Sequence, residues 1–141
     1  MSGRALAEML SVLLDTHILV WWQSDQGRLS KAQTRSLMEV EAGSASAAIS
    51  DITLWEAALL VDRGRLQIDG SLDVWLDEIQ SHPRLTVLPI TAAVAAESVR
   101  LGRGFPKDPA DRIIAATARC HGLRLMTADE NIRRWGRVPV I

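Results

Sequence analysis

The stretch DPADRIIAATARCHGLRLMTADENI (residues 108–132) predicts a helix, a buried strand and a second helix in immediate succession. The first helix would begin at Pro109, a residue suited to the first helical position, and would stop at Gly122. The apolar run 123–126 is typical of a short buried strand, and Asp129 stands where the next helix would begin. A helix that leads directly into a buried strand is the repeating unit of a parallel α/β sheet.

The same alternation continues outward from this stretch to both ends of the chain. Further strands are expected over residues 12–14, 47–49, 85–90 and 138–141, and further helices over 16–22, 30–42, 51–61, 71–79 and 91–101. No repeat or long linker divides the chain, so residues 1–141 are predicted to form a single α/β domain. Its central parallel sheet would have about four to five strands, with helices on both faces. Residues 1–8 are expected to be an extension before the first strand, and Met9 is an alternative start.

The composition is that of a globular domain rather than of a disordered or membrane-spanning chain. Of the 141 residues, 48% are hydrophobic, and no apolar run approaches the roughly 20 residues that a bilayer requires. The first residues lack a long apolar region with a small-residue cleavage site, so no signal peptide is expected. The single cysteine, Cys120, excludes an internal disulfide, suggests a cytoplasmic protein and is expected to be a small core residue.

The net charge of −1 conceals a strong asymmetry along the chain. Residues 1–99 contain 7 basic and 13 acidic side chains, whereas residues 100–141 contain 9 basic and 4 acidic ones. If the acids of residues 100–141 bind a cation, that cation offsets their charge and mainly basic side chains remain around them. Such a surface suits a polyanionic substrate. A solvated charged surface is an equally good explanation for any one arginine. The basic residues concerned are Arg100, Arg103, Lys107, Arg112, Arg133, Arg134 and Arg137.

Four aspartates stand where a helix would begin, and each has two explanations. Asp15 and Asp129 follow predicted strands, so both would lie at the carboxyl edge of a parallel sheet, where such sheets bind ligands. Asp108 and Asp111 open the helix of the stretch quoted above. Aspartate is also a favoured N-cap, and capping alone accounts well for Asp108 and less well for Asp111.

Glu56 is not explained by capping, because it lies inside an apolar helical pattern. Its neighbours on the same predicted face are Ile52, Leu59 and Leu60. A buried carboxylate without a partner would be strongly destabilising or would take up a proton, and a divalent cation shared with the aspartates removes that problem. An oxygen-only donor set favours Mg²⁺, with Mn²⁺ as the alternative. The predicted metal site consists of Asp15, Glu56, Asp111 and Asp129, with Asp108 as an accessory.

Other residues near these acids are candidates for supporting roles. Ser50, Thr53 and Thr127 could orient the acids or bind a metal water. His17 is expected at most to support the direct ligands and not to bind the metal itself, since hard cations prefer oxygen. Arg112 could contact phosphate or could only pair with a nearby acid. The tryptophans in apolar helical contexts are expected in the core or at a dimer interface; they are Trp21, Trp22, Trp55 and Trp75.

Four motifs carry these acids: VLLDTHILVWW (12–22), SDITLWEAAL (50–59), FPKDPADRIIAATA (105–118) and LMTADENI (125–132). As a set, in this order and at this spacing, they resemble the PIN-domain family, specifically the VapC-type toxins of bacterial toxin–antitoxin pairs. The resemblance places the family's first-strand Asp on Asp15 and its helical Glu on Glu56. It places the Asp that precedes the apolar helix on Asp111 and the last acid on Asp129. Asp108 matches an acid of this toxin subgroup that many PIN domains lack.

The resemblance implies a Mg²⁺- or Mn²⁺-dependent endoribonuclease that cuts tRNA, rRNA or mRNA and is held inactive by a cognate antitoxin. A homodimer is also expected. One alternative is a receiver-like signalling domain with a Mg²⁺ pocket, but such a domain would usually need an acidic pair after the first strand and a late lysine. Asp15 stands alone, and neither Lys31 nor Lys107 follows a late strand. The other alternative is a catalytically silent PIN interaction module, against which the complete acid set argues.

Overall fold

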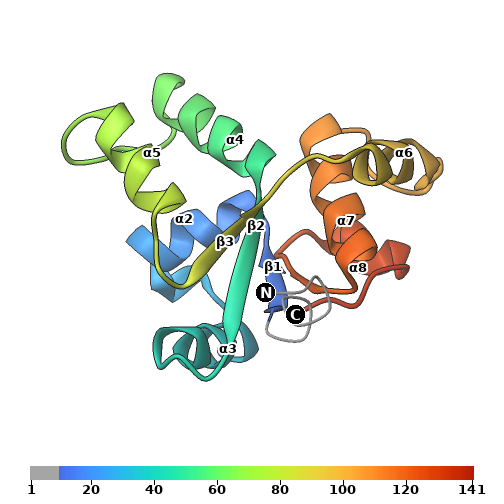
Figure 1. Cartoon of the computed structure of the whole chain (residues 1–141), viewed down its shortest axis with the longest axis horizontal. Coiled ribbons are helices and arrows are strands. Elements are labelled where there is room, and N and C mark those ends of the chain that lie inside the picture. The colour runs from blue at the N-terminus through green and yellow to red at the C-terminus, as the bar shows by residue number, and fades with distance from the viewer. Residues whose placement is uncertain (1–9) are drawn as a thin grey trace.

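The computed structural model describes residues 10–141, and its centre is one parallel sheet (Figure 1). The strand order is β3-β2-β1-β4, and every neighbouring pair runs parallel. The carboxyl ends of all four strands therefore lie at the same edge of the sheet. The predicted α/β class with a parallel sheet is confirmed. The strands are β1 (Leu10–Leu14), β2 (Ser46–Ser50), β3 (Leu85–Leu88) and β4 (Arg124–Met126).

Seven α-helices surround the sheet in the described part of the chain. Serine or threonine hydroxyls cap four of them, as the side chain of Ser30 does when it accepts from the backbone N–H of Gln33. None of the described helices is both long and apolar enough to cross a membrane. The helices are α2 (Thr16–Ser24), α3 (Lys31–Glu41), α4 (Asp51–Asp62), α5 (Leu72–Gln80), α6 (Ala92–Arg100), α7 (Pro109–His121) and α8 (Glu130–Trp135), with a short 3-10 turn over Gln26–Arg28.

Two apolar cores lie on opposite faces of the sheet because side chains alternate along each strand. In β1, Leu13 packs with residues of α7 and α8, whereas Val12 and Leu14 pack with residues of α2, α3 and α5. Figure 1 shows these two groups of helices on either side of the sheet. Trp22 belongs to the second core, with 8% of its surface exposed, and its indole N–H donates to Glu41 at 2.7 Å.

The predicted strand over residues 138–141 is not formed as an element. Val140 makes only an isolated parallel bridge to Leu125, at the outer side of the three-residue strand β4. Pro139 accepts a hydrogen bond from the backbone N–H of Leu125 but has no N–H of its own to extend a ladder. The expected extension over residues 1–8 and the alternative start at Met9 lie outside the described residues.

Gln33, which is 2% exposed, joins three separate segments at the carboxyl edge of the sheet. Its Oε1 accepts from the backbone N–H of Ser30, so it completes a capping box at the start of α3. Its Nε2 donates to the carbonyl of Thr127 and to the carbonyl of Ile141, both at 3.1 Å. The loop that follows β4 is thereby attached to α3 and to the last residue of the chain.

Helix α4 leaves the sheet at the end of β2 and packs against α2, α5 and α7. It therefore connects helices from both faces across the carboxyl edge. Of its own side chains, only Thr53 and Ala57 are buried, although the helix is apolar on all sides. Trp55 is 57% exposed, so this tryptophan lies neither in the core nor under another described element.

Candidate functional site

Strands β1 and β4 bring two predicted ligands to neighbouring positions. Leu14 is paired with Met126, and the backbone N–H of Asp15 donates to the carbonyl of Met126 at 3.1 Å. Asp15 is thus the first residue beyond β1, and Asp129 follows three residues beyond β4. Together with Asp111 they line one cleft of about 370 Å³. The sequence-based placement of these three acids at one sheet edge agrees with the structure.

Asp15 and Asp129 each cap a helix, and a backbone N–H in the first turn of that helix holds one oxygen of the carboxylate. Asp15 Oδ1 accepts from the backbone N–H of Ile18 at 2.9 Å, at the start of α2. Asp129 Oδ1 accepts from the backbone N–H of Asn131 at 2.8 Å, at the start of α8. A cap engages one oxygen and holds the carboxyl group in a defined orientation, so capping and metal binding are compatible roles rather than alternatives.

Asp108 caps helix α7 and also lies beside another of the predicted acids, Glu56. Its Oδ1 accepts from the backbone N–H of Asp111 at 3.1 Å, at the start of α7. It also lines a second cleft of about 190 Å³, which it shares with Glu56 and Thr16. Asp108 therefore lies beside Glu56 of α4 and at the start of α7, the helix that carries Asp111.

Glu56 reaches this edge from the middle of α4 and is half-buried, as its helical pattern predicts. The hydroxyl of Thr16 donates to Glu56 Oε1 at 2.6 Å, and it lies 3.2 Å from the hydroxyl of Thr53. This short bond compensates part of the burial of Glu56. Thr16 was not singled out in the sequence, because nothing in the local pattern indicates that α2 and α4 meet at this point.

Burial and mutual repulsion disfavour charge on several of these acids. Burial raises the pKa of Asp15 and of Glu56, and hydrogen bonds from Thr127 and Thr16 respectively oppose that effect. For Asp111, burial together with the charges of Asp108 and Glu56 raises the pKa from 3.8 to about 7. Acids so destabilised as anions are the groups that a bound cation would stabilise most.

The carboxylate oxygens of these acids suit a magnesium or manganese ion that keeps part of its water better than an ion enclosed entirely by protein ligands. Among residues 10–141, no three His, Cys, Asp or Glu side chains are gathered closely enough to hold an ion as they stand. The acids nevertheless influence one another, since Asp15 and Asp129 both contribute to the raised pKa of Asp111. Mg²⁺ commonly keeps several waters and is bound through one or two carboxylates, so its binding does not require three such side chains gathered closely.

A family model described as PIN domain matches residues 12–138. The chain belongs to the PIN-domain family. It is 38% identical to Ribonuclease VapC22 of Mycobacterium tuberculosis over 125 residues, which covers 89% of this chain and 92% of that protein. It resembles a chain of a toxin–antitoxin complex from Klebsiella pneumoniae, with 26% identity, a TM-score of 0.63 and coverage of 93% and 96%. The fold is also that of a chain in VapBC2 from Rickettsia felis bound to promoter DNA, with a TM-score of 0.69, 21% identity and coverage of 94% and 98%.

Two of the predicted supporting residues act on different parts of the PIN domain. The hydroxyl of Thr127 accepts from the backbone N–H of Asp129 at 3.0 Å, and the Thr127 side chain also lowers the pKa of Asp15. Thr127 therefore orients two acids. Ser50 is fully buried, and its hydroxyl accepts from the backbone N–H of Ile52, so it caps α4 rather than contacting an acid.

Arg112 has a structural role in place of the predicted phosphate or carboxylate contact. Its guanidinium donates to the carbonyls of Ser98, Gly102 and Phe105, at 3.3, 2.9 and 3.3 Å. These bonds tie the loop between α6 and α7 to the start of α7. A guanidinium committed to three carbonyls has few donors left for substrate.

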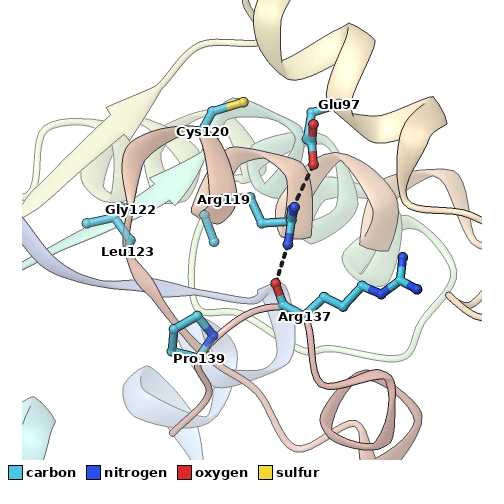
Figure 2. Close-up of a pocket in the computed structure, with 8 residues that line it drawn as sticks. Glu97, Arg119, Cys120, Gly122, Leu123, Arg137 and Pro139 are labelled. Carbon is cyan, nitrogen blue, oxygen red and sulfur yellow. Dashed lines mark hydrogen bonds and ion pairs between the residues drawn. The ribbon is translucent and has the colours of Figure 1, made fainter.

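A separate pocket at the far end of α7 contains none of the predicted site residues (Figure 2). Arg119 there pairs with Glu97 at 2.7 Å and donates to the carbonyl of Arg137, so it connects α6, α7 and the segment after α8. Cys120 at this pocket is exposed, and the expectation of a core cysteine was wrong. It occupies the outward side of α7 close to the helix end.

The arginines that line the clefts beside the acids of this PIN domain are not among the basic residues named from the sequence. Arg133 donates to the carbonyl of Thr127 at 2.8 Å and so supports the loop rather than the substrate. The arginines that line the two clefts beside the acids come instead from the acidic part of the chain. They are Arg28 in the larger cleft and Arg63 and Arg65 in the smaller one.

Proposed function

We propose that this chain is a divalent-metal-dependent endoribonuclease and the toxin of a toxin–antitoxin pair. The observation that carries the proposal is the meeting of acids from four separate segments at one sheet edge, where the pKa of Asp111 is raised to about 7. The 38% identity to a protein named as a ribonuclease supports the same activity. Mg²⁺, with Mn²⁺ as the alternative, is the proposed cofactor.

The residues divide into holding and orienting roles. Asp15, Asp111 and Asp129 would hold the ion directly or through water, and Glu56 would be a fourth ligand or would orient the attacking water. When bound, the ion supplies activation of water and neutralisation of the leaving 3′-oxygen. Water then adds to phosphorus, the bond to the 3′-oxygen breaks with transfer of a proton to it, and the other fragment keeps a 5′-phosphate. Thr127 and Thr16 keep the acids in place for this reaction.

The RNA could be tRNA, rRNA or mRNA, since all three carry the same phosphodiester. Mapping the 5′-phosphate ends that accumulate after induced expression would identify the target. Such a map would also show whether cleavage falls in unpaired regions.

We propose further that a cognate antitoxin covers the outer face of α4 and α5. Trp55 and Val74 are 57% and 59% exposed there, beside half-buried apolar side chains of both helices. Exposed apolar surface of this kind is typical of a protein-binding face. The homodimer and the cytoplasmic location stay predictions, to be checked by the mass in solution and by fractionation.

The test is the replacement Asp15→Asn, compared with Asp62→Asn at the exposed end of α4. Asp15→Asn should lower Mg²⁺-dependent RNA cleavage by at least about a hundredfold, since it removes a charged ligand and leaves the cap to Ile18 possible. Asp62→Asn should leave cleavage unchanged. Circular dichroism and thermal melting would show that both variants are folded. Full cleavage and growth arrest by a folded Asp15→Asn protein would contradict the nuclease proposal, and no cleavage by the unmodified protein would favour a silent module.

A further inference from the structure

Another cleft, which we call the Trp135 pocket, lies between the loop that precedes α7 and helix α8. Its volume is about 480 Å³, and pockets that bind small molecules commonly measure roughly 300 to 1,000 Å³. The loop contributes residues 104–107, and α8 contributes Asn131, Arg134 and Trp135. None of the predicted metal ligands lines this pocket, so it is a site of its own.

One face of α8 forms a wall of the pocket, because Asn131, Arg134 and Trp135 stand at positions i, i+3 and i+4 of the helix. The Trp135 ring is fixed on this wall. It meets the buried Phe105 ring edge-on, with 5.0 Å between the ring centres, and the guanidinium carbon of Arg119 lies 5.7 Å from its centre. An aromatic side chain held in this way can receive a ligand without first having to be ordered.

The opposite wall is the loop before α7, and Arg112 holds it in place. The Arg112 guanidinium donates to the carbonyls of Gly102 and Phe105, at 2.9 and 3.3 Å. Gly104 keeps this wall away from the indole: a Cβ atom there would lie 3.5 Å from Trp135 Cδ1 and would meet nothing else beyond its chain neighbours. The backbone of Gly104 is not left-handed, so a larger side chain would enter this space without backbone strain.

The lining of the Trp135 pocket carries two positive charges and no acidic side chain. Lys107 and Arg134, one from each wall, are both exposed. No ion pair between residues 10–141 involves either of them. The two clefts that contain the predicted metal ligands are, by contrast, lined by acids as well as by arginines. Two cations that face each other across a pocket without an acid favour an anion such as a phosphate group.

We propose that the Trp135 pocket binds one nucleotide. The phosphate lies between Lys107 and Arg134, and the base packs against the rings of Trp135 and Pro106. The exposed amide of Asn131 offers a donor and an acceptor side by side, which can distinguish the edge of one base from that of another. A nucleotide combines a phosphate, a flat ring and a polar ring edge, and each of the three has a counterpart in this pocket.

The nucleotide can come from two sources, a free nucleoside phosphate or a position in an RNA strand. The pocket adjoins the acids, because Lys107 precedes Asp108 and the backbone N–H of Asn131 donates to Asp129 Oδ1 at 2.8 Å. A nucleotide next to the cut bond could therefore reach it. Only this second source rests on the proposed nuclease function, since binding of a nucleotide does not require cleavage.

Binding is measured on the full chain by NMR titration in EDTA, so that no metal ion bridges a phosphate to the acids. The probes are the four nucleoside 5′-monophosphates, adenosine and inorganic phosphate. The indole N–H resonance of Trp135, identified by its loss in Trp135→Phe, reports events in the pocket. The variants are Lys107→Ala, Arg134→Ala, Asn131→Ala and Gly104→Leu.

Two matched controls lie outside the pocket. Arg103→Ala removes an exposed cation of the same loop. Gly27→Leu enlarges another glycine whose backbone is not left-handed and whose Cβ atom would meet only Asp25, at 3.9 Å. Circular dichroism and thermal melting show which variants are folded.

At least one monophosphate should shift the Trp135 resonance and bind about tenfold more tightly than phosphate or adenosine, which each make only part of the contacts. Lys107→Ala and Arg134→Ala should each weaken binding of nucleotide and phosphate about tenfold, because a charged hydrogen bond is lost. Gly104→Leu should weaken only nucleotide binding, by about tenfold, since it fills the space for the base. Asn131→Ala should reduce the differences among the four bases. The controls should change binding by less than about twofold.

Cleavage of a mixed-sequence RNA with Mg²⁺ present distinguishes the two sources. If the nucleotide belongs to the RNA strand, Asn131→Ala changes which bases are found beside the cut, and the preferred monophosphate inhibits cleavage. If the ligand is a free nucleotide, the bases beside the cut stay the same and the monophosphate does not inhibit. Both results support a nucleotide in the pocket.

An unshifted Trp135 resonance at about 10 mM of every monophosphate would overturn the proposal. Binding of inorganic phosphate as tight as that of the nucleotides would also overturn it, because the pocket would then hold an anion and no base. So would equal weakening in the pocket variants and the controls. Because the titrations involve no cleavage, a lack of Mg²⁺-dependent cleavage by the unmodified protein would count against the proposed function alone.

Discussion

Helices α4 and α7 each bring an acid to the same sheet edge, but they are built for different surroundings. Helix α7 has Pro109 in its first turn, a left-handed Gly122 (φ 65°) at its end, and six buried residues facing the core. Helix α4 is apolar on all sides, yet only two of its residues are buried and Trp55 is 57% exposed. One helix completes the core of this chain, whereas the other presents apolar surface outward.

The two acids differ in the same way. Asp111 lies in the first turn of its helix, where the positive end of the helix dipole favours a carboxylate. Glu56 lies in mid-helix without such support and depends on a hydroxyl from α2. The site therefore combines an acid placed by the rules of a helix start with an acid placed by contact between helices. Three experiments would sharpen or break this comparison.

The largest expected effect concerns the outward face of α4. Trp55→Ala should weaken binding of the cognate antitoxin by about 30-fold or more, since a tryptophan at the centre of an interface commonly contributes about 2 kcal/mol or more. Val99→Ala on α6 is a matched control, because Val99 is 78% exposed but isolated from α4 and α5. Titration calorimetry with the purified partner would measure both. Equal affinities for the two variants would show that the antitoxin binds elsewhere.

The second effect concerns the hydroxyl that supports Glu56. Thr16→Val should lower the rate of RNA cleavage about tenfold and shift the acidic limb of the pH–rate profile to higher pH, because the Thr16 bond lowers the pKa of Glu56. Thr53→Val keeps that bond and removes only the contact between the two hydroxyls, so it serves as the control. A lower rate with an unshifted profile would show that Thr16 acts on folding or packing rather than on Glu56.

The smallest effect concerns the stability of the metal-free protein. Since folding raises the pKa of Asp111 from 3.8 to about 7, the folded state should lose stability as the pH rises from about 4 to about 7. Asp111→Asn removes this dependence and should raise the melting temperature at pH 8 in EDTA by at least about 3 °C, which corresponds to ~1 kcal/mol in a domain of this size. Adding Mg²⁺ should stabilise only the unmodified protein. A lower melting temperature for Asp111→Asn under these conditions would contradict the cause given for the raised pKa.

The sequence predicted what depends on local pattern. Apolar runs and caps located the strands and helices, and the position of Asp15 and Asp129 after parallel strands was enough to place them together. Glu56 could be singled out because a carboxylate in an apolar helical pattern needs a partner. The strand expected over 138–141 is reduced to one bridge and three backbone hydrogen bonds, because Pro139 has no N–H with which to extend the ladder towards residue 138.

What the sequence could not supply depends on which segments meet in space. Arg112 stands next to a predicted ligand, but its side chain turns to the carbonyls of the α6–α7 loop. Arg28 follows Asp15 by 13 residues and lines the larger cleft by way of the turn after α2. Arg63 and Arg65 follow Glu56 by 7 and 9 residues and line the smaller cleft from the end of α4. The division of the chain into an acidic and a basic part therefore did not point to the arginines that line the two clefts beside the acids.

The side chain of Gln33 also has a practical consequence for spectroscopy. Its amide group bonds the carbonyls of Thr127 and Ile141 and is almost fully buried, so its two protons should exchange slowly and resonate apart from those of exposed glutamines. Thr127 orients Asp129, yet Gln33 itself is not a proposed ligand. A single ¹⁵N-labelled glutamine amide would therefore report the arrival of a metal ion at the site, with every acid left intact.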